Sequence, residues 1–108
     1  VIFNFSKVTT LRYGKMVALN KKDGSVKWAK DMTYYSWSSP VAVYSNDGTP
    51  YIIFCNSIGQ VLLIDAITGE TLFTLNSGGG NFEGSPAVFD NKIVIGSRGK
   101  RIFCIEIK

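Results

Sequence analysis

Apolar residues occur in short runs along this chain, and the runs are rich in β-branched and aromatic side chains. No window of useful length repeats apolar residues at the 3.6-residue spacing of a helix, so the pattern predicts strands throughout. Turn sequences separate the runs, as in Asp47-Gly48 and Thr68-Gly69, which is typical of antiparallel hairpins. We therefore expect an all-β fold. The main expected strands are Val41–Tyr44, Tyr51–Phe54, Val61–Ile64, Thr71–Leu75, Ile93–Ile95 and Ile102–Ile107.

One segment of the chain recurs in three related copies. Residues 14–28 (GKMVALNKKDGSVKW) align without gaps with residues 59–73 (GQVLLIDAITGETLF) at an offset of 45. A third copy, residues 100–106, aligns with residues 59–65 at an offset of 41. Several anchors that share one period indicate a repeat architecture. The pairs of matched anchors are Asn20 with Asp65, Gly24 with Gly69, and Trp28 with Phe73.

A period of about 40–45 residues built from β units is typical of β-propeller blades. Each copy is expected to form four antiparallel strands, and a single sheet of this kind buries its apolar faces only by stacking on neighbours. We expect one propeller segment over residues 1–108, about two and a half blades of a partial ring. The repeats are expected at residues 1–31 (partial), 38–76 (complete) and 84–108 (partial, with the outer strand missing).

The segment Ala18–Trp28 (ALNKKDGSVKW) resembles the tryptophan-docking motif of propeller blades of the pyrroloquinoline-quinone (PQQ) type. That motif has the pattern Ala-x-Asp-x-x-Thr-Gly-x-x-x-Trp. Asn20 stands in the Asp position and Asp23 in the Thr position, whereas Gly24 and Trp28 match. An Asx residue before a turn and a glycine within it is also sound hairpin chemistry.

The two later copies keep parts of this motif. The second copy has Asp, Thr and Gly in place but carries Phe73 in the Trp position, and the third keeps an acid, Glu106, with Cys104 in the Ala position. The resemblance covers essentially the whole chain and implies that the turn and aromatic residues pack one sheet on the next, in preference to stacking on a ligand. These structural anchors are Asn20, Gly24, Trp28, Asp65, Gly69, Phe73 and Glu106.

Charge is distributed unevenly along the chain. Residues 1–30 carry a net charge of +6, residues 31–91 carry −6 without any Lys or Arg, and residues 92–108 carry +4. The basic residues fall in expected turns and solvated strand faces, so we expect no nucleic-acid partner. No apolar stretch approaches the roughly 18–20 residues of a membrane-spanning helix. The first residues do not have the pattern of a signal peptide and instead resemble the middle of a strand. We therefore expect further residues before Val1.

Few residues of this chain are suited to catalysis or metal binding. There is no histidine to serve as a base or as a zinc ligand, and Gly78-Gly79-Gly80 lacks the Lys-Ser/Thr of a phosphate loop. Cys55 and Cys104 each lie between apolar residues; two buried free thiols are the preferred interpretation, and a disulfide is the alternative. We therefore expect no catalytic residues, no metal site and no cofactor.

The more promising functional candidates lie in loops. In a propeller, the connections between blades and the loops from second to third strands emerge on the same side, where aromatic and Arg side chains commonly anchor a partner. The alternative is that the aromatic residues fill gaps between blades. The candidate binding residues are Tyr34, Tyr35, Trp37, Asn56, Asn81, Phe82 and Arg98.

Resemblance to the PQQ class does not by itself imply an enzyme. Its dehydrogenases have eight blades, calcium-binding acids and often adjacent cysteines, whereas many other members are non-catalytic. We expect a non-enzymatic scaffold for a protein or glycan, in a bacterial envelope or outside the cell, with neighbouring blades or self-association covering its open faces. The alternative is that the chain is part of a PQQ-dependent dehydrogenase, or of a regulatory propeller fused to an enzyme. The family arrangement also suggests a C-terminal piece of a larger propeller, whose N-terminal segment supplies the last outer strand.

Overall fold

The protein is all-β, as the sequence predicts. The computed structural model describes residues 2–5, 14–32, 36, 38–78, 80–82 and 84–107. Within these residues there are ten strands and no helix. Consequently, these residues hold no helix of the length and hydropathy that crossing a membrane requires.

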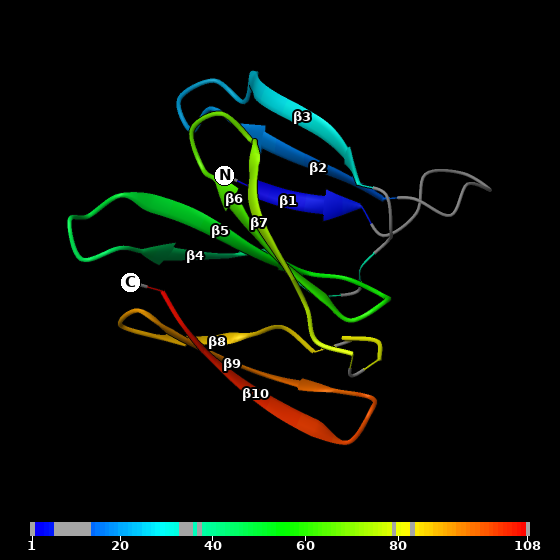
Figure 1. Cartoon of the computed structure of the whole chain (residues 1–108). Coiled ribbons are helices and arrows are strands. Elements are labelled where there is room, and N and C mark those ends of the chain that lie inside the picture. The colour runs from blue at the N-terminus through cyan, green and yellow to red at the C-terminus, as the bar shows by residue number, and fades with distance from the viewer. Residues whose placement is uncertain are drawn as a thin grey trace.

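The strands form three separate antiparallel sheets (Figure 1). The N-terminal sheet has the order β1-β2-β3 and consists of β1 (Ile2–Phe5), β2 (Gly14–Leu19) and β3 (Val26–Met32). The middle sheet has the order β4-β5-β6-β7 and consists of β4 (Val41–Tyr44), β5 (Pro50–Cys55), β6 (Gln60–Asp65) and β7 (Thr71–Asn76). The C-terminal sheet has the order β10-β9-β8 and consists of β8 (Ala87–Phe89), β9 (Lys92–Ser97) and β10 (Arg101–Glu106).

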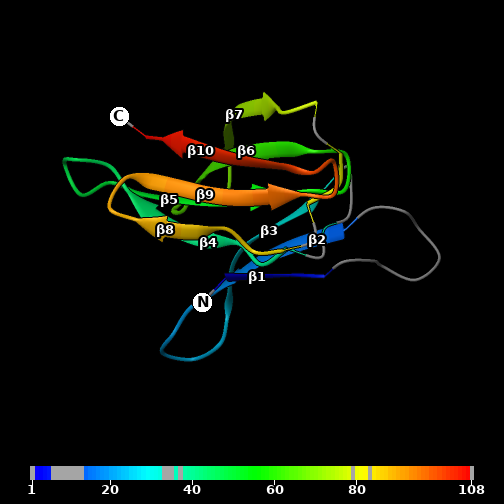
Figure 2. The same cartoon turned by 90° about the horizontal axis from the view of Figure 1, so that it is seen from below.

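The three sheets stack face to face in chain order, in a body of 41 × 41 × 19 Å, and those described do not close a ring. The four-stranded sheet lies within residues 38–76, where a complete repeat is expected. Seen from below, β8, β9 and β10 lie over β4, β5 and β6, and β7 projects beyond β10 (Figure 2). The middle sheet thus has one strand that the C-terminal sheet does not cover.

The repeat is visible in the backbone of the first two sheets. A register shift interrupts the β2–β3 ladder between Ala18 and Leu19, and an equivalent shift interrupts the β6–β7 ladder 45 residues later. In both following turns the Gly N–H donates to the Asx carbonyl, at 2.9 Å from Gly24 to Asn20 and again 45 residues later. Gly24 has a φ of 75° and its counterpart Gly69 a φ of 80°, which glycine adopts without strain.

Two apolar cores hold the stack together. One lies between the N-terminal and middle sheets; the other lies between the middle and C-terminal sheets and includes Val43, Cys55, Phe82 and Ile93, all with no exposed surface. Alternate residues of β5 point into the two cores, because successive side chains of a strand point to opposite faces. The continuous apolar run of β5 follows from this double burial. The first core consists of Met16, Met32, Ile52, Phe54 and Ile64.

The outer face of the C-terminal sheet corrects one sequence prediction. Cys55 is buried, but Cys104 is exposed, so the expectation of two buried thiols is right only for Cys55. Cys104 alternates along β10 with Phe103 and Ile105, which pack on the middle sheet, and it therefore lies on the opposite face. Ile102, on this same face, is 80% exposed. Both thiols are free in the structure.

Candidate functional site

The predicted binding loops of the middle and C-terminal sheets meet at one end of the stack. The segment after β7 runs along the hairpin turn between β5 and β6 and then reaches the turn between β9 and β10 (Figure 1). Ser77 donates to the carbonyl of Gly59 from its N–H at 3.0 Å and from its hydroxyl at 2.6 Å. The Arg98 N–H donates to the carbonyl of Asn81 at 2.9 Å. We call residues 56–60, 77, 78, 80–82 and 97–100 the loop rim.

Glycine is required at the centre of the loop rim. Gly59 has a φ of 81°, and a Cβ built there would lie 2.6 Å from the carbonyl oxygen of Gly80. A backbone atom at that distance cannot move aside as a flexible side chain does. The close approach of the two loops therefore depends on the missing side chain.

Asn56 and Phe82 belong to the interior of the loop rim. The Oδ1 of Asn56 accepts hydrogen bonds from the N–H groups of Ile58 and Gln60 at 3.2 and 3.0 Å, and its side chain is buried. Phe82 has no exposed surface and meets Phe103 edge-on, with ring centroids 5.9 Å apart. The binding role expected for these two residues stays a prediction, and the burial of Phe82 agrees with the alternative, in which the aromatic residues fill gaps between sheets.

Asn81 and Arg98 are the predicted binding residues with solvent access among those described. Asn81 is half-buried and Arg98 is exposed, and the hydrogen bond between their backbones places them together. The remaining predicted residues, Tyr34, Tyr35 and Trp37, lie outside the described residues. The sequence thus brings one Arg–Asn pair to the accessible surface of the loop rim.

Two serines that the sequence analysis did not single out tie the first connecting segment to the middle sheet. The Ser36 hydroxyl donates to the carbonyl of Cys55 and accepts a hydrogen bond from the Ser38 N–H at 3.0 Å. Further along, the Ser39 N–H donates to the hydroxyl of Ser85, its counterpart in the next repeat, at 2.9 Å. Ser39-Pro40 recurs as Ser85-Pro86 in the sequence, 46 residues later, and this recurrence was the available signal for the second contact.

The N-terminal and middle sheets are joined by an aromatic contact that the repeat anchors predict. The indole Nε1 of Trp28 donates to the carbonyl of Ala66 at 3.1 Å. A Cβ built on Gly69 would lie 2.7 Å from the Trp28 ring, so the ring packs directly on the glycine of the next turn. The anchors of the two turns cap their own hairpins: Asn20 Oδ1 accepts from the Lys22 N–H, and Asp65 Oδ1 accepts from the Ile67 N–H.

Lys30 adds a polar tie beside Trp28. Its Nζ donates to the carbonyl of Gly69 and to the hydroxyl of Thr71, each at 2.7 Å. Partial burial lowers the pKa of Lys30, and the negative charge of Glu70 opposes this shift. Trp28 and Lys30 therefore contact the same turn from one strand.

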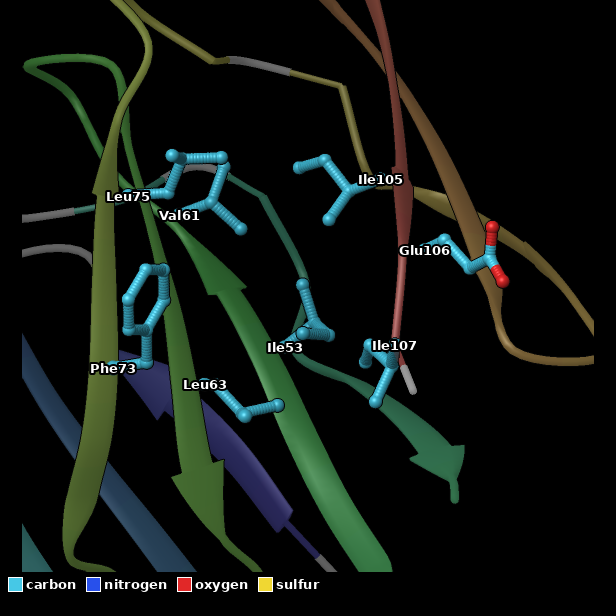
Figure 3. Close-up of a pocket in the computed structure, with 8 residues that line it drawn as sticks. All are labelled: Ile53, Val61, Leu63, Phe73, Leu75, Ile105, Glu106 and Ile107. Carbon is cyan, nitrogen blue, oxygen red and sulfur yellow. The ribbon is translucent and has the colours of Figure 1, made fainter. Parts of the chain in front are cut away.

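Phe73, the counterpart of Trp28, has a different environment. It is 60% exposed and lines an open cavity of about 250 Å³ between the middle and C-terminal sheets. The reason is geometric, because no described turn of the C-terminal sheet reaches Phe73 as residues 66–69 reach Trp28. Figure 3 shows the apolar lining of this cavity, which we call the open groove. Its main lining residues are Ile53, Leu63, Phe73, Leu75, Ile105 and Ile107.

Glu106 is the predicted turn anchor of the third copy. It occupies the sequence position of Asp65, and its carboxylate points to the opposite side of β10 from Ile105 and Ile107 (Figure 3). The residue after it is held by Asn91, whose carbonyl accepts from the Ile107 N–H and whose Nδ2 donates to the Ile107 carbonyl, both at 2.8 Å.

The titratable groups with shifted pKa values are structural. Burial raises the pKa of the Cys55 thiol to about 12, which removes its nucleophilic thiolate at neutral pH. Hydrogen bonds from Ser45 and Thr49 lower the pKa of Asp47 to about 2 and stabilise its turn. In the part of the chain that the structure describes, no three His, Cys, Asp or Glu side chains form a group suited to a metal ion.

We expected no Ser-x-x-Lys spacing, which could serve as a serine–lysine nucleophile pair, and this expectation is wrong, because residues 97–100 (SRGK) have it. This spacing lies in the turn between β9 and β10, where the Ser97 hydroxyl accepts a hydrogen bond from the Gly99 N–H at 3.2 Å. Lys100 has a φ of 62°, the counterpart of the positive φ at Gly59. The spacing therefore belongs to a β-turn, and hydrogen bonding within that turn accounts for the serine.

Comparison with known proteins gives one informative match. No protein-family model matches the chain. Over 97 residues, 87% of the chain, it is 30% identical to the β-alanine-activating enzyme of Danio rerio. The chain spans 8% of that relative's length.

Proposed function

We propose that this chain is part of a β-propeller of the PQQ-like type that serves as a non-enzymatic scaffold and presents the loop rim to a protein or glycan. The observation that carries the proposal is the stack of three sheets, in which two equivalent turns lie 45 residues apart and Trp28 of the first sheet packs on the turn of the next. A rigid stack of this kind supports loops in fixed positions, and the loop rim gathers Asn81 and Arg98 at one end.

The chemistry of the loop rim supports a hydrogen-bonding partner. Arg98 offers a planar guanidinium and Asn81 an amide, which suit carboxylates, peptide carbonyls or sugar hydroxyls. Anchoring both loops through backbone hydrogen bonds limits the conformational entropy lost on binding. The predicted location in a bacterial envelope or outside the cell stays an untested prediction.

The test of this proposal is a binding screen with variants of the loop rim. The chain is labelled and screened against a glycan array and a peptide array, with Arg98→Ala compared with Arg101→Ala. Arg101 is a fitting control because it is exposed on the same hairpin, at the start of β10. We expect Arg98→Ala to weaken a specific signal at least tenfold and Arg101→Ala to leave it unchanged. Equal effects of the two variants, or no specific signal, would refute the loop rim as a binding surface.

A second candidate function is an accessory propeller within an enzyme. The match to part of the Danio rerio β-alanine-activating enzyme favours it, since the matched segment is a small share of that protein. In this case the chain itself does not catalyse the activation of β-alanine. Calorimetric titration of the chain with β-alanine would show no heat of binding, and removal of the matched segment from that relative would leave its activation step intact while changing stability or partner binding.

A PQQ-dependent enzyme is the competing alternative, and spectroscopy separates it from both proposals. Titration of the chain with PQQ and Ca²⁺ should leave the absorption spectrum of PQQ unchanged. A saturable spectral change would support a cofactor site and count against a scaffold.

A further inference from the structure

We propose that the cleft between the β2–β3 turn and the β6–β7 turn is a binding site for an organic phosphate, a small molecule that carries one phosphate group on an apolar body. The cleft lies at the end of β6 opposite to the loop rim, so the site is separate from the loop rim and goes beyond the proposed scaffold function. We call it the lysine cleft. Its lining residues are Ile2, Ala18, Leu19, Asn20, Lys21, Lys22, Lys27 and Ala66.

The first observation is that the cleft has the size of a small-molecule site. Its volume is about 340 Å³, within the roughly 300–1,000 Å³ that is common for such sites. The turn between β2 and β3 lies beside the turn between β6 and β7 (Figure 1), and the hydrogen bond from Trp28 to the carbonyl of Ala66 joins the two turns. The lysine cleft therefore has walls from two sheets that are already docked on each other.

The second observation is the charge of the cleft. Among the described residues that line it, three are exposed lysines and none is acidic. Asp23 belongs to the same turn but is engaged within it, because its Oδ1 accepts hydrogen bonds from the N–H and the hydroxyl of Ser25 at 2.9 and 2.7 Å. Residues 20–27 carry a net charge of +2, which a single phosphate dianion neutralises.

The third observation is that the repeat does not need these lysines to form its turn. The middle sheet has an equivalent turn, in which the Gly69 N–H donates to the carbonyl of Asp65 at 2.9 Å. The counterparts of the three lysines in that copy, 45 residues later, are Ala66, Ile67 and Leu72. The same turn is therefore built with apolar residues, and the lysines add positive charge that the fold does not require.

The fourth observation concerns the residue that caps the turn. Asn20 lines the cleft, whereas its counterparts in the other two copies are the acids Asp65 and Glu106. The Oδ1 of Asn20 accepts from the Lys22 N–H at 3.1 Å, as the Oδ1 of Asp65 accepts from the Ile67 N–H at 2.8 Å. The amide caps the turn as the carboxylate does, but it lacks the negative charge that would repel an anion. The charges of the capping residue and of the lysines thus both favour an anionic ligand.

The lining chemistry indicates which anion fits. The ammonium group of lysine is a compact point charge that binds phosphate without the planar, bidentate geometry by which arginine recognises carboxylates. Beside the lysines, Ile2, Leu19 and Ala66 give the cleft an apolar wall. Inorganic phosphate would leave this wall in contact with water, whereas an organic phosphate would cover it with its apolar body.

The experiment uses phenyl phosphate as the probe, because it combines one phosphate group with one apolar ring. Inorganic phosphate lacks the ring and phenol lacks the charge, so each tests one feature of the ligand. All three are titrated into the isotope-labelled chain at constant ionic strength and about pH 7.5, where the phosphate is mainly a dianion. Amide chemical shifts of residues 20–27 give the dissociation constant, and the other amides show whether binding is confined to the lysine cleft.

Three variants are titrated in the same way. Asn20→Asp restores the acid of the other copies and keeps the cap, and the double variant Lys22→Gln, Lys27→Gln removes two charges from the cleft. The matched control, Lys92→Gln with Arg101→Gln, removes the same charge from exposed positions on the C-terminal sheet. Melting temperatures show that each variant is folded.

We expect saturable shifts with phenyl phosphate, binding of inorganic phosphate that is weaker by about threefold or more, and no response to phenol. Asn20→Asp and the double lysine variant should each weaken binding by about fivefold or more, and the control by about twofold at most. Equal losses in the two double variants would mean non-specific attraction and would overturn the site, as would the absence of saturable shifts. Inorganic phosphate that binds as tightly as phenyl phosphate would overturn an organic ligand. None of these outcomes affects the Arg98→Ala test, because the loop rim lies at the other end of β6.

Discussion

The indole ring of Trp28 packs directly on Gly69, so closely that a Cβ at residue 69 would lie 2.7 Å from Cδ2. These residues come from different repeats: Trp28 ends the first turn-and-aromatic segment, and Gly69 belongs to the second. The contact explains why the repeat combines a glycine turn with a large aromatic residue. The aromatic residue of one copy packs on the turn glycine of the next.

Gly69→Ala should be much more destabilising than Gly24→Ala. Both glycines have a positive φ, which costs alanine about 1 kcal/mol, but Gly24 has no atom within 4 Å of its Cβ position. At Gly69 the clash with Trp28 should add about 1–3 kcal/mol. Chemical denaturation measures both variants, and equal losses would contradict direct packing of Trp28 on Gly69.

Trp28→Ala should lower the free energy of unfolding by about 2–4 kcal/mol through loss of the buried ring surface. Trp28→Phe should cost less, about 1 kcal/mol for the lost hydrogen bond to Ala66, because it keeps an aromatic ring. In the Trp28→Ala background, Gly69→Ala should cost no more than Gly24→Ala. Strictly additive effects of the two substitutions would mean that the residues are not coupled.

The two cysteines should differ sharply in reactivity. Cys104 is exposed, whereas burial raises the pKa of Cys55 to about 12. A thiol reagent at pH 8 should therefore label one cysteine per folded chain quickly and the second only after denaturation. Cys104→Ser should abolish the fast phase and Cys55→Ser should preserve it. Fast labelling of both thiols would refute burial of Cys55.

Asp47 should make the stability of the fold depend on pH in the acid range. Its pKa is lowered from 3.8 to about 2 in the folded chain by hydrogen bonds from Ser45 and Thr49. A carboxylate with a lowered folded pKa stabilises the fold above its unfolded pKa, and this contribution is lost as pH falls from about 4 to about 2. Asp47→Asn should flatten the melting-temperature profile over this range. Asp90→Asn, in the equivalent hairpin, is the control.

The all-β class could be predicted from the sequence because periodicity and turn residues act locally. Asp47-Gly48 and Thr68-Gly69 each specify a turn within a few residues, and the structure has hairpins at both. The contact of Trp28 with the next sheet also agrees with the repeat, since the turn glycine that receives the ring lies in the next copy of the segment.

The exposure of individual residues could not be predicted in the same way. Phe73 and Trp28 occupy equivalent positions, but Phe73 is largely exposed because its environment depends on the sheet that follows. Phe82 lies in a loop, where the sequence suggests a contact with a partner, yet its side chain is fully buried in the core. Such differences are set by packing between distant segments, which local patterns do not encode.

The docking of the N-terminal sheet on the middle sheet depends above all on the contact of Trp28 with the turn at Gly69. Nuclear Overhauser effects between the Trp28 indole protons and the Gly69 Hα protons test it most directly. We predict strong cross-peaks and a Gly69 Hα resonance shifted upfield by the ring current, both abolished in Trp28→Ala. Absence of these cross-peaks in the folded protein, with Gly69 Hα shifts like those of Gly24, would contradict the claim.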